Sequence, residues 1–484
     1  MKYRYINQQF FNFSKFLTVK FITEMESQIY INRRKQLSKQ VGHGIIILPG
    51  NNLVPMNYPS NTMPFRQDSN FLYFAGVDLP ALVYLIDCDE DKEILFGIEP
   101  TTIDLIWTGH QTGLRELANP YGINTVSEIS NLYKTIESAL KKGKKIHYLP
   151  PYPADRKITL ASLLGKSIEM ITQGSSPDLI KAVVSQRLYK SDAEITEIED
   201  ALEITRKIHI NSIKMSLAGQ YEYDVVAQIH SIAKQQNTGF AYPVICTVHG
   251  EILHNESHIN QLEIGDLLLI DAGVESKLHY ASDITRTFPV GGKFSSQQKE
   301  IYEIVLATQL KTIENIKAGI RFFDLHFEAA KNITEGLISL GLIKGNLEEA
   351  VHAGAHSLFF PHGLGHALGL DVHDMEDLGE NYVGHGNDTL NDRKLGGVSI
   401  RFSRMLEAGF VMTVEPGIYF IPALIDLWMK EKKCERFINY SGINEYRNFG
   451  GIRIEDNLLI TKSGGRVLGS PIPKSVKEIE DFSK

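Results

Sequence analysis

The chain has 484 residues, 43% hydrophobic and 22% charged, which is enough for about two to four domains with buried cores. Acidic side chains exceed basic ones by 58 to 50, and the resulting net charge of −8 disfavours binding to nucleic-acid phosphates. The three scattered cysteines form no Cys-x-x-Cys pair, so we expect no disulfide framework, no thiolate metal site and a cytoplasmic location. No stretch approaches the roughly 18 apolar residues of a membrane-spanning helix, so no membrane association is expected.

The first residues, 1–25, are expected to form a disordered extension that precedes the folded part. Lys15 and Lys20 interrupt any apolar region, which argues against a secretory signal, whereas an amphipathic targeting segment stays open as the alternative. From residue 26 to 185, strand-like runs at 44–48, 82–86 and 93–96 alternate with helical stretches such as 126–141. This alternation predicts a compact α/β domain that ends in a linker near 185–190.

The remainder, 186–484, shows a different pattern of long helices and strand pairs. Ser191 and Glu194 have the spacing of a capping box, and Ile195, Ile198 and Leu202 follow at helical spacing. Two further long helices are predicted over 296–317 and 324–340. This order of elements predicts an α+β domain in which helices back a curved sheet.

Four carboxylates and one histidine in this second part stand in contexts unusual for surface charges. They are Asp271, Asp283, His366, Glu415 and Glu455. The four acids lie in or beside runs of β-branched and large apolar residues, at 266–273, 283–289, 410–417 and 451–460. Buried carboxylates are costly unless something neutralises them. Any one of them alone could be a capping or salt-bridged acid, but the set together has the composition of a two-metal hydrolytic site.

The strand period explains how these acids could meet. Side chains alternate faces along a strand, so Asp283 and Thr285 share one face, and Arg453 and Glu455 share another. Oxygen-rich ligand sets suit Mn²⁺, Mg²⁺ or Co²⁺ better than the thiolate and imidazole sets of structural zinc sites. Without metal, clustered carboxylates repel one another and their pKa values rise.

Several segments resemble the pita-bread metallopeptidases, and among them aminopeptidase P and prolidase, over nearly all of 185–465. They are Asp271-Ala-Gly, Ser282-Asp-Ile-Thr-Arg-Thr-Phe-Pro, Pro361-His-Gly-Leu-Gly-His, Leu370-Asp-Val-His-Asp, Thr413-Val-Glu-Pro-Gly and Gly451-Ile-Arg-Ile-Glu-Asp. Segments 64–76 and 106–109 resemble the N-terminal domain of aminopeptidase P more closely than that of prolidase. The resemblance implies an α/β N-terminal domain followed by an α+β pita-bread (creatinase/aminopeptidase-like) catalytic domain.

The resemblance also implies roles for individual residues. One divalent ion would be bound by Asp271, Asp283 and Glu455, and the other by Asp283, His366, Glu415 and Glu455. Mn²⁺ is the usual ion in the family, with Co²⁺ or Zn²⁺ as alternatives. His254, His362 and His373 match histidines that contact substrate, whereas His352, His356 and His385 match nothing and are expected at the surface.

The implied activity is hydrolysis of the N-terminal Xaa-Pro bond of peptides. A metal-bridging hydroxide would attack the carbonyl, Glu415 would shuttle the proton, and the three histidines would wall the proline ring and stabilise the oxyanion. Prolidase, restricted to dipeptides, is one alternative, and a binding module without peptidase chemistry is the other. The complete ligand set speaks against the binding module.

Four features carry alternatives. Arg453 either orients Glu455, binds substrate or forms a structural salt bridge. Trp107 matches a family position that reaches a neighbouring subunit's site, which predicts a homodimer or homotetramer; an intradomain core tryptophan is the other interpretation. The long polar segments 375–403 and 421–448 depart from the shorter bacterial pattern, and they are lids, oligomer contacts or surface decoration.

Overall fold

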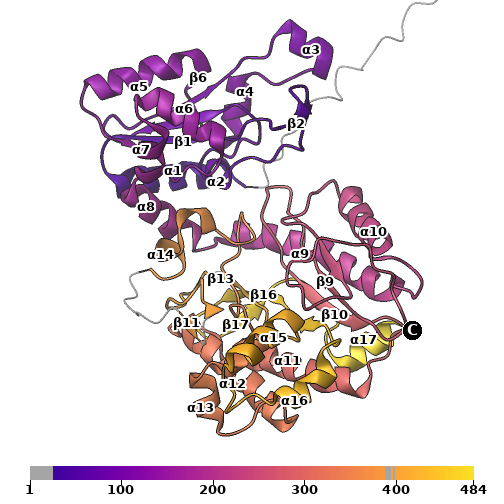
Figure 1. The fold of residues 1–484 in the computed structure, drawn as a ribbon. Helices are drawn as coiled ribbons and strands as arrows, with labels where there is room; N and C mark the ends of the chain where they lie inside the picture. Colours follow the sequence, from indigo (N-terminus) through magenta and orange to yellow (C-terminus); the bar gives the residue numbers. More distant parts are fainter. Residues whose placement is uncertain (1–24, 387–393, 396–397, 484) are drawn as a thin grey trace, which may run out of the picture. The chain divides into compact units, whose positions relative to one another are not determined.

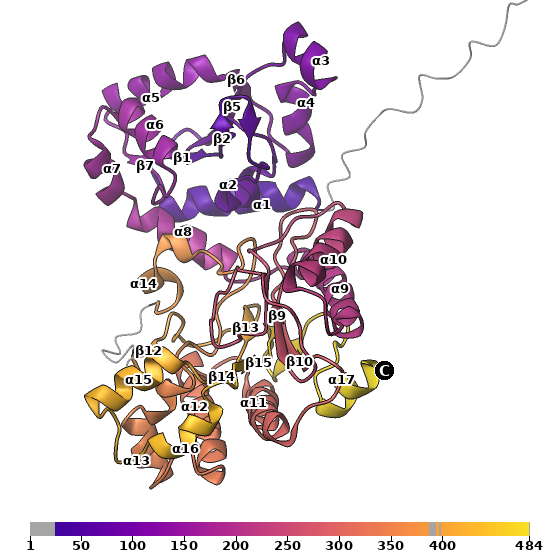
Figure 2. The same cartoon turned by 45° about the vertical axis from the view of Figure 1, so that its right-hand side comes forward.

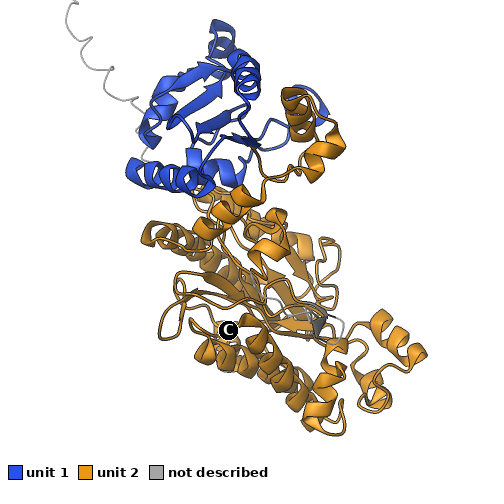
Figure 3. Ribbon diagram, turned by 90° about the vertical axis from the view of Figure 1, so that its left-hand side faces the viewer, with its two compact units in different colours: residues 1–146 blue, residues 147–484 orange. Residues whose placement is uncertain are grey.

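The computed structural model of the protein describes residues 25–386, 394–395 and 398–483. The predicted extension lies almost entirely outside these residues, as does the middle of segment 375–403. The chain divides into two compact units, Met1–Ile146 and His147–Lys484 (Figure 3). This division falls before the predicted linker at 185–190, and the domain boundary at residue 185 stays a prediction.

The first unit is built on a five-stranded mixed sheet in the order β6-β5-β4-β1-β7 (Figure 1). Its elements are α1 (Ser27–Val41), β1 (Ile45–Pro49), β2 (Pro55–Tyr58), β3 (Asn61–Thr62), α2 (Ser69–Ala75), β4 (Val83–Asp87), β5 (Lys92–Gly97), α3 (Thr102–Thr108), α4 (Leu114–Ala118), β6 (Val126–Glu128), α5 (Leu132–Lys141) and β7 (Ile146–His147). The three predicted strand runs are β1, β4 and β5. The helix predicted over 126–141 begins only at Leu132, because residues 126–128 pair in parallel with β5.

The second unit contains most of the long helices and several small antiparallel sheets. Its elements are α6 (Ala154–Leu164), α7 (Ile168–Gln173), α8 (Pro177–Arg187), α9 (Asp192–Met215), α10 (Glu222–Gln235), β8 (Ile245–Thr247), β9 (Leu267–Asp271), β10 (Thr285–Pro289), α11 (Ser296–Asn315), α12 (Phe322–Ser339), α13 (Leu347–His352), α14 (Glu380–Val383), β11 (Lys394–Leu395), β12 (Val398–Ser399), β13 (Val411–Val414), β14 (Gly417–Tyr419), α15 (Pro422–Glu431), α16 (Tyr440–Ile443), β15 (Gly451–Arg453), β16 (Asp456–Ile460), β17 (Gly465–Val467) and α17 (Val476–Phe482). None of the helices within the described ranges is long and apolar enough to cross a membrane.

Antiparallel pairing brings distant strands of the second unit together. β9 lies between β8 and β10, β16 lies between β13 and β17, and β14 pairs with β15. Helices α9 and α10 lie side by side (Figure 2). Helix α10 packs on β8, whereas α11 packs on β13, β14, β15 and β17. One continuous core fills the space between these helices and strands, and β9 and β10 are buried along their whole length.

Local signals set the starts of the long helices as predicted. The Ser191 side chain accepts a hydrogen bond from the Glu194 amide, and the Glu194 carboxylate accepts one from the Ser191 amide. Ile195, Ile198 and Leu202 are all buried, as their helical spacing predicted. The helices predicted over 296–317 and 324–340 are α11 and α12, with ends that differ by one or two residues.

Candidate metal centre

Two of the predicted acidic ligands stand on the sheet formed by β8, β9 and β10. Asp271 ends β9, where it is paired directly with Thr285 of β10 and Ile245 of β8. Asp283 lies two residues before β10, so the antiparallel pairing returns it to the neighbourhood of Asp271. Both aspartates are buried, because Asp271 ends one core strand and Asp283 lies just before another.

The two glutamates occupy equivalent places in the neighbouring strand pairs. Glu415 lies between β13 and β14, and Glu455 lies between β15 and β16. Val414 pairs with Asp456, and Gly417 pairs with Arg453. The register therefore places Glu415 and Glu455 side by side, where the pair β13–β16 meets the pair β14–β15. The Glu455 amide donates a hydrogen bond to the Thr285 carbonyl at 3.1 Å, which links this segment to β10.

His366 comes from a loop and is fixed by two sets of hydrogen bonds. Its backbone exchanges bonds with Thr413 at 2.9 and 3.0 Å, and its Nδ1 lies 3.1 Å from the Ala367 carbonyl. A carbonyl only accepts, so Nδ1 carries the proton and Nε2 keeps a free lone pair. Nε2 lies 3.3 Å from Asp283 and 3.7 Å from Glu415. The five predicted ligands thus converge on one site.

The electrostatics of this site favour a bound cation. Burial, followed by the charge of Asp271, raises the pKa of Asp283 well above its ordinary value. Burial and the neighbouring Asp283 raise the pKa of Glu455 in the same way, and burial and Glu455 raise that of Glu415. Burial lowers the pKa of His366 to about 4, so its imidazole is neutral at pH 7. Carboxylates that resist ionisation beside a neutral imidazole form a ligand set for divalent metal.

The geometry of the donor atoms fits that interpretation. Asp283, His366 and Glu455 offer ligand atoms that all lie within 4.8 Å of one another. The carbonyl bond to Nδ1 of His366 is the outer contact that metal-binding histidines ordinarily make, because it fixes the tautomer and the ring orientation. Glu415 lies 3.7 Å from His366, and Asp271 shares the Tyr242 hydroxyl with Asp283.

Tyr242 belongs to the centre and was missed by the sequence interpretation. Its hydroxyl lies 2.6 Å from Oδ1 of both Asp271 and Asp283, and it can donate to either carboxylate. Burial and the two aspartates raise the pKa of Tyr242 well above its ordinary value, so the phenol stays protonated. A tyrosine in a loop carries no periodic signal, and only the pairing of residues 240–241 with residues 273–274, just after β9, brings it here.

Arg453 forms a buried salt bridge, which was one of its three interpretations, and the partner is Asp271 instead of Glu455 on its own strand face. Its Nη2 donates to Asp271 at 2.6 Å, its Nη1 to the Tyr419 hydroxyl and its Nε to Thr285. The carboxylate that Arg453 orients is therefore Asp271, whereas Glu455 accepts a hydrogen bond from Thr285 at 2.7 Å. The difference arises because Arg453 is long enough to cross from β15 to the end of β9.

The three predicted substrate histidines lie in different surroundings. His362 is partly buried, and both of its ring nitrogens contact protein groups, the Gly363 carbonyl and the Tyr419 hydroxyl, each at 2.8 Å. His373 packs against His366 with ring centroids 4.1 Å apart and the rings tilted by 46°, and its Nδ1 contacts Glu376. His254 is exposed, and its charge contributes to lowering the pKa of His362 to about 3, after burial and Arg453.

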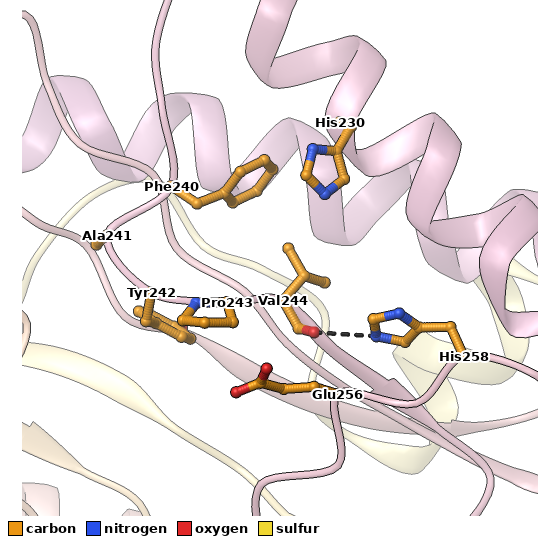
Figure 4. A pocket seen from close by; sticks show the side chains of 8 residues that line it. All are labelled: His230, Phe240, Ala241, Tyr242, Pro243, Val244, Glu256 and His258. Atoms are coloured by element: carbon orange, nitrogen blue, oxygen red, sulfur yellow. Dashed lines mark hydrogen bonds between the residues drawn. The ribbon is translucent and has the colours of Figure 1, made fainter. Parts of the chain in front are cut away.

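An open pocket of about 530 Å³ borders the centre through Tyr242. It is lined by His230, Phe240, Ala241, Tyr242, Pro243, Val244, Glu256 and His258 (Figure 4). The His258 ring is tied to the Val244 carbonyl at 3.1 Å, and His230 lies against Phe240. Tyr242 therefore connects the acidic cluster with this largely apolar cavity.

Other predicted positions have mixed outcomes. Trp107 lies on α3 of the first unit and is 82% exposed, so the interpretation as a core tryptophan is wrong. The surface assignment is also wrong for His356 and His385, which are buried, because His356 packs in the core beside α12 and His385 bonds to Ser403. His352 is exposed, as expected.

Comparison with known proteins agrees with this architecture. Residues 196–462 match the model of metallopeptidase family M24, and residues 30–148 match that of the aminopeptidase P N-terminal domain. A probable Xaa-Pro aminopeptidase of Uncinocarpus reesii is 33% identical over 91% of this chain and 90% of its own length. Another from Botryotinia fuckeliana is 33% identical over 90% of this chain and 91% of its own.

Solved structures give the same result. Aminopeptidase PepP of Pseudomonas aeruginosa has a TM-score of 0.79 and 30% identity, covering 95% of this chain and 98% of its own. A zinc-substituted Escherichia coli aminopeptidase P with product gives the same TM-score and identity over 95% and 99%. The fold and the site thus define a pita-bread metallopeptidase of family M24, and the predicted fold class is confirmed. Within that class the chain belongs to the aminopeptidase P family.

Proposed function

We propose that this enzyme removes the first residue from peptides whose second residue is proline, using two divalent ions held by the acidic cluster. The observation that carries the proposal is that Asp283, His366 and Glu455 offer donor atoms within 4.8 Å of one another, with Asp271 and Glu415 beside them in a group of mutually repelling carboxylates. A binding module has no need of such a group, whose carboxylates are costly unless cations neutralise them. The match to the aminopeptidase P N-terminal domain favours this activity over that of a prolidase.

The individual residues have distinct tasks in this proposal. Asp283 and Glu455 would contact both ions, Asp271 would complete the first site, and His366 and Glu415 would complete the second. When bound, divalent ions lower the pKa of water and so supply a nucleophile near neutral pH. Arg453 and Tyr242 hold the Asp271 carboxylate in place through bonds of 2.6 Å.

Glu415 is the proposed proton carrier. Its carboxylate lies 3.7 Å from Nε2 of His366, at the centre itself, where it would accept a proton and then donate it. The recipient is the proline nitrogen, which carries no hydrogen in the peptide and must be protonated to leave. Asp271 and the other acids would also hold the free amine of the substrate, which limits cleavage to one N-terminal residue.

Proline must be recognised by shape, because its nitrogen offers no hydrogen bond before cleavage. His254, His362 and His373 would form the wall against the ring and stabilise the oxyanion. Both nitrogens of His362 are engaged with Gly363 and Tyr419, which favours the wall as its main task. His254 and His373 are the more exposed pair and are better placed to reach substrate.

Paired peptides test the activity directly. Metal-stripped enzyme would be assayed on an Xaa-Pro dipeptide and an Xaa-Pro-Yaa tripeptide, with products identified after addition of Mn²⁺, Co²⁺ or Zn²⁺. We expect release of Xaa from the tripeptide only when metal is added, with Mn²⁺ the most effective. Cleavage of the dipeptide alone would make the enzyme a prolidase, and cleavage of neither would support the binding module.

The metal assignment predicts that Asp283→Ala and Glu455→Ala each abolish activity and lower the number of bound ions. Both residues would contact both ions, so loss of either carboxylate affects the whole centre. The bound metal would be counted by elemental analysis of the purified variants. Unchanged turnover in either variant would contradict the site assignment.

Assembly into a homodimer or homotetramer is also proposed. Trp107 on α3 is 82% exposed, and Ile103 and Ile106 beside it are 66% and 74% exposed. Such an apolar helix face is costly in water and suits contact with a second copy. Light scattering would give the mass, and Trp107→Ser is expected to weaken the assembly. A monomeric mass for the unmodified enzyme would contradict this proposal.

A further inference from the structure

A cluster of four charges, three of them buried, contacts the loop that carries His366 and His373. Arg187, at the end of α8, donates from Nη2 to Asp371 at 2.8 Å and to Asp374 at 2.6 Å. Lys190 donates from Nζ to the other oxygen of Asp374 at 2.8 Å. The side chains of Arg187, Lys190 and Asp374 are each only 1% exposed. Two cations thus hold one carboxylate in a fixed position away from water.

The backbone of Asp374 links this cluster of charges to the metal centre. Its amide donates to the Ala367 carbonyl at 2.9 Å, which closes the loop between residues 367 and 374. The same carbonyl accepts the hydrogen bond from Nδ1 of His366 at 3.1 Å. That bond sets the tautomer of the imidazole and aims Nε2 at Asp283 and Glu415.

The cluster also fixes the neighbouring histidine. His373 directly precedes Asp374 and packs against His366 with ring centroids 4.1 Å apart. Gly369 leaves the space that the Asp374 carboxylate occupies, because a Cβ there would lie 2.4 Å from its Oδ2. The loop therefore has little freedom to shift while Asp374 stays bound to both cations.

We infer that Arg187, Lys190 and Asp374 are positioning residues that act through the Ala367 carbonyl to aim the His366 imidazole at the metal. None of the three belongs to the ligand set or to the residues proposed to touch substrate. The inference rests on the proposed function, since it requires that His366 binds metal. A cluster that only stabilised the fold would leave metal affinity unchanged.

The test measures Mn²⁺ binding to full-length, metal-stripped protein by calorimetry, independently of activity. Lys190→Met keeps the length of the side chain but releases one oxygen of Asp374. We expect its dissociation constant for Mn²⁺ to rise about tenfold or more, as outer-shell substitutions ordinarily cause. Lys190→Arg, which restores the charge, should recover most of the lost affinity.

The matched control is Lys144→Met in the first unit. Lys144 forms an ion pair with Asp87, with contacts of 2.6 and 2.7 Å, and the two side chains are 12% and 14% exposed. Loss of Lys144 therefore measures the cost of breaking a largely shielded ion pair away from the metal centre. We expect lower thermal stability in this variant but the Mn²⁺ affinity of the unmodified enzyme. Gly369→Ala is a second, independent variant, since its Cβ would push on Asp374 without removing any charge, and it should also bind Mn²⁺ more weakly.

The outcomes are distinct. If the unmodified enzyme binds Mn²⁺ and the Lys190→Met and Gly369→Ala variants bind it more weakly, the positioning role is supported. If either folded variant binds Mn²⁺ as tightly as the unmodified enzyme, the inference is overturned while the proposed function stands. If the unmodified enzyme binds no divalent ion, both fail.

Discussion

At the scale of single residues, the metal centre depends on neighbours that bind no metal themselves. Tyr242 bonds to two aspartates, Thr285 bonds to Glu455, and the Ala367 carbonyl bonds to His366. Each contact fixes a donor atom in a direction that a flexible side chain would not hold by itself. Outer contacts of this kind ordinarily change metal affinity strongly when they are removed.

The hydroxyl of Tyr242 provides a clean test of this dependence. Tyr242→Phe keeps the ring in its pocket but removes the donor to Asp271 and Asp283. We expect metal affinity to fall about 10- to 100-fold with little change in folding, because the two carboxylates lose the group that orients them. Mn²⁺ titration of the metal-stripped variant would measure the loss, and a circular dichroism spectrum would confirm the fold. An unaltered dissociation constant would mean that the contact is incidental.

At the scale of elements, the ligands stand at the ends of short strands and not within them. β9 ends at Asp271, β10 begins after Asp283, and Glu415 and Glu455 each separate two strands. Helix α11 packs on β13, β14 and β15, which are strands next to the two glutamates. This support limits the number of arrangements that the Glu415 and Glu455 carboxylates can adopt.

The start of α11 should therefore affect stability more than catalysis. Ser295 caps this helix, since its hydroxyl accepts from the Gln298 amide and its own amide donates to the Gln298 side chain. Ser295→Ala is expected to lower the free energy of unfolding by about 1 kcal/mol. Urea denaturation would measure this, and Ser295→Asp, which can still cap, serves as the control. Equal stability of the alanine variant and the unmodified enzyme would contradict the capping role.

At the scale of the whole molecule, buried histidines away from the centre link stability to pH. His326 and His356 are fully buried, and within the described residues their ring nitrogens have no hydrogen-bond partner. Burial lowers the pKa of His326 to about 3 and that of His356 to about 4. In the unfolded chain these histidines take up protons near pH 6.5. In the folded state both rings are still neutral at that pH.

The sign of the pH effect follows from that difference. Between pH 6.5 and about 4 the unfolded state binds protons that the folded state does not, so the free energy of unfolding falls as pH falls. Each histidine contributes a slope of up to about 1.4 kcal/mol per pH unit. His326→Leu should reduce the slope accordingly, as measured by denaturation at several pH values, and should cost little stability at pH 8. An unchanged slope would show that His326 is protonated in the folded enzyme.

The sequence by itself determined the chemistry of the centre. Asp271, Asp283, Glu415 and Glu455 could be recognised because each lies within or at one end of an apolar, strand-like run, where a carboxylate is costly without a cation. Helix starts such as that at Ser191 could also be predicted, since capping depends on residues three positions apart. These signals depend on residues that are close together in the chain, so they can be recognised without the structure.

The tertiary structure decided the contacts that position those groups. Tyr242 lies 41 residues from Asp283, and Arg187 lies 187 residues from Asp374, so no periodic pattern connects them. The strand period placed Arg453 and Glu455 on one face, yet the arginine reaches Asp271 on a different strand. A sequence pattern does not distinguish Asp271 from Glu455 as the partner of Arg453. The length of the arginine side chain and the arrangement of the strands decide between them, and that arrangement depends on tertiary packing.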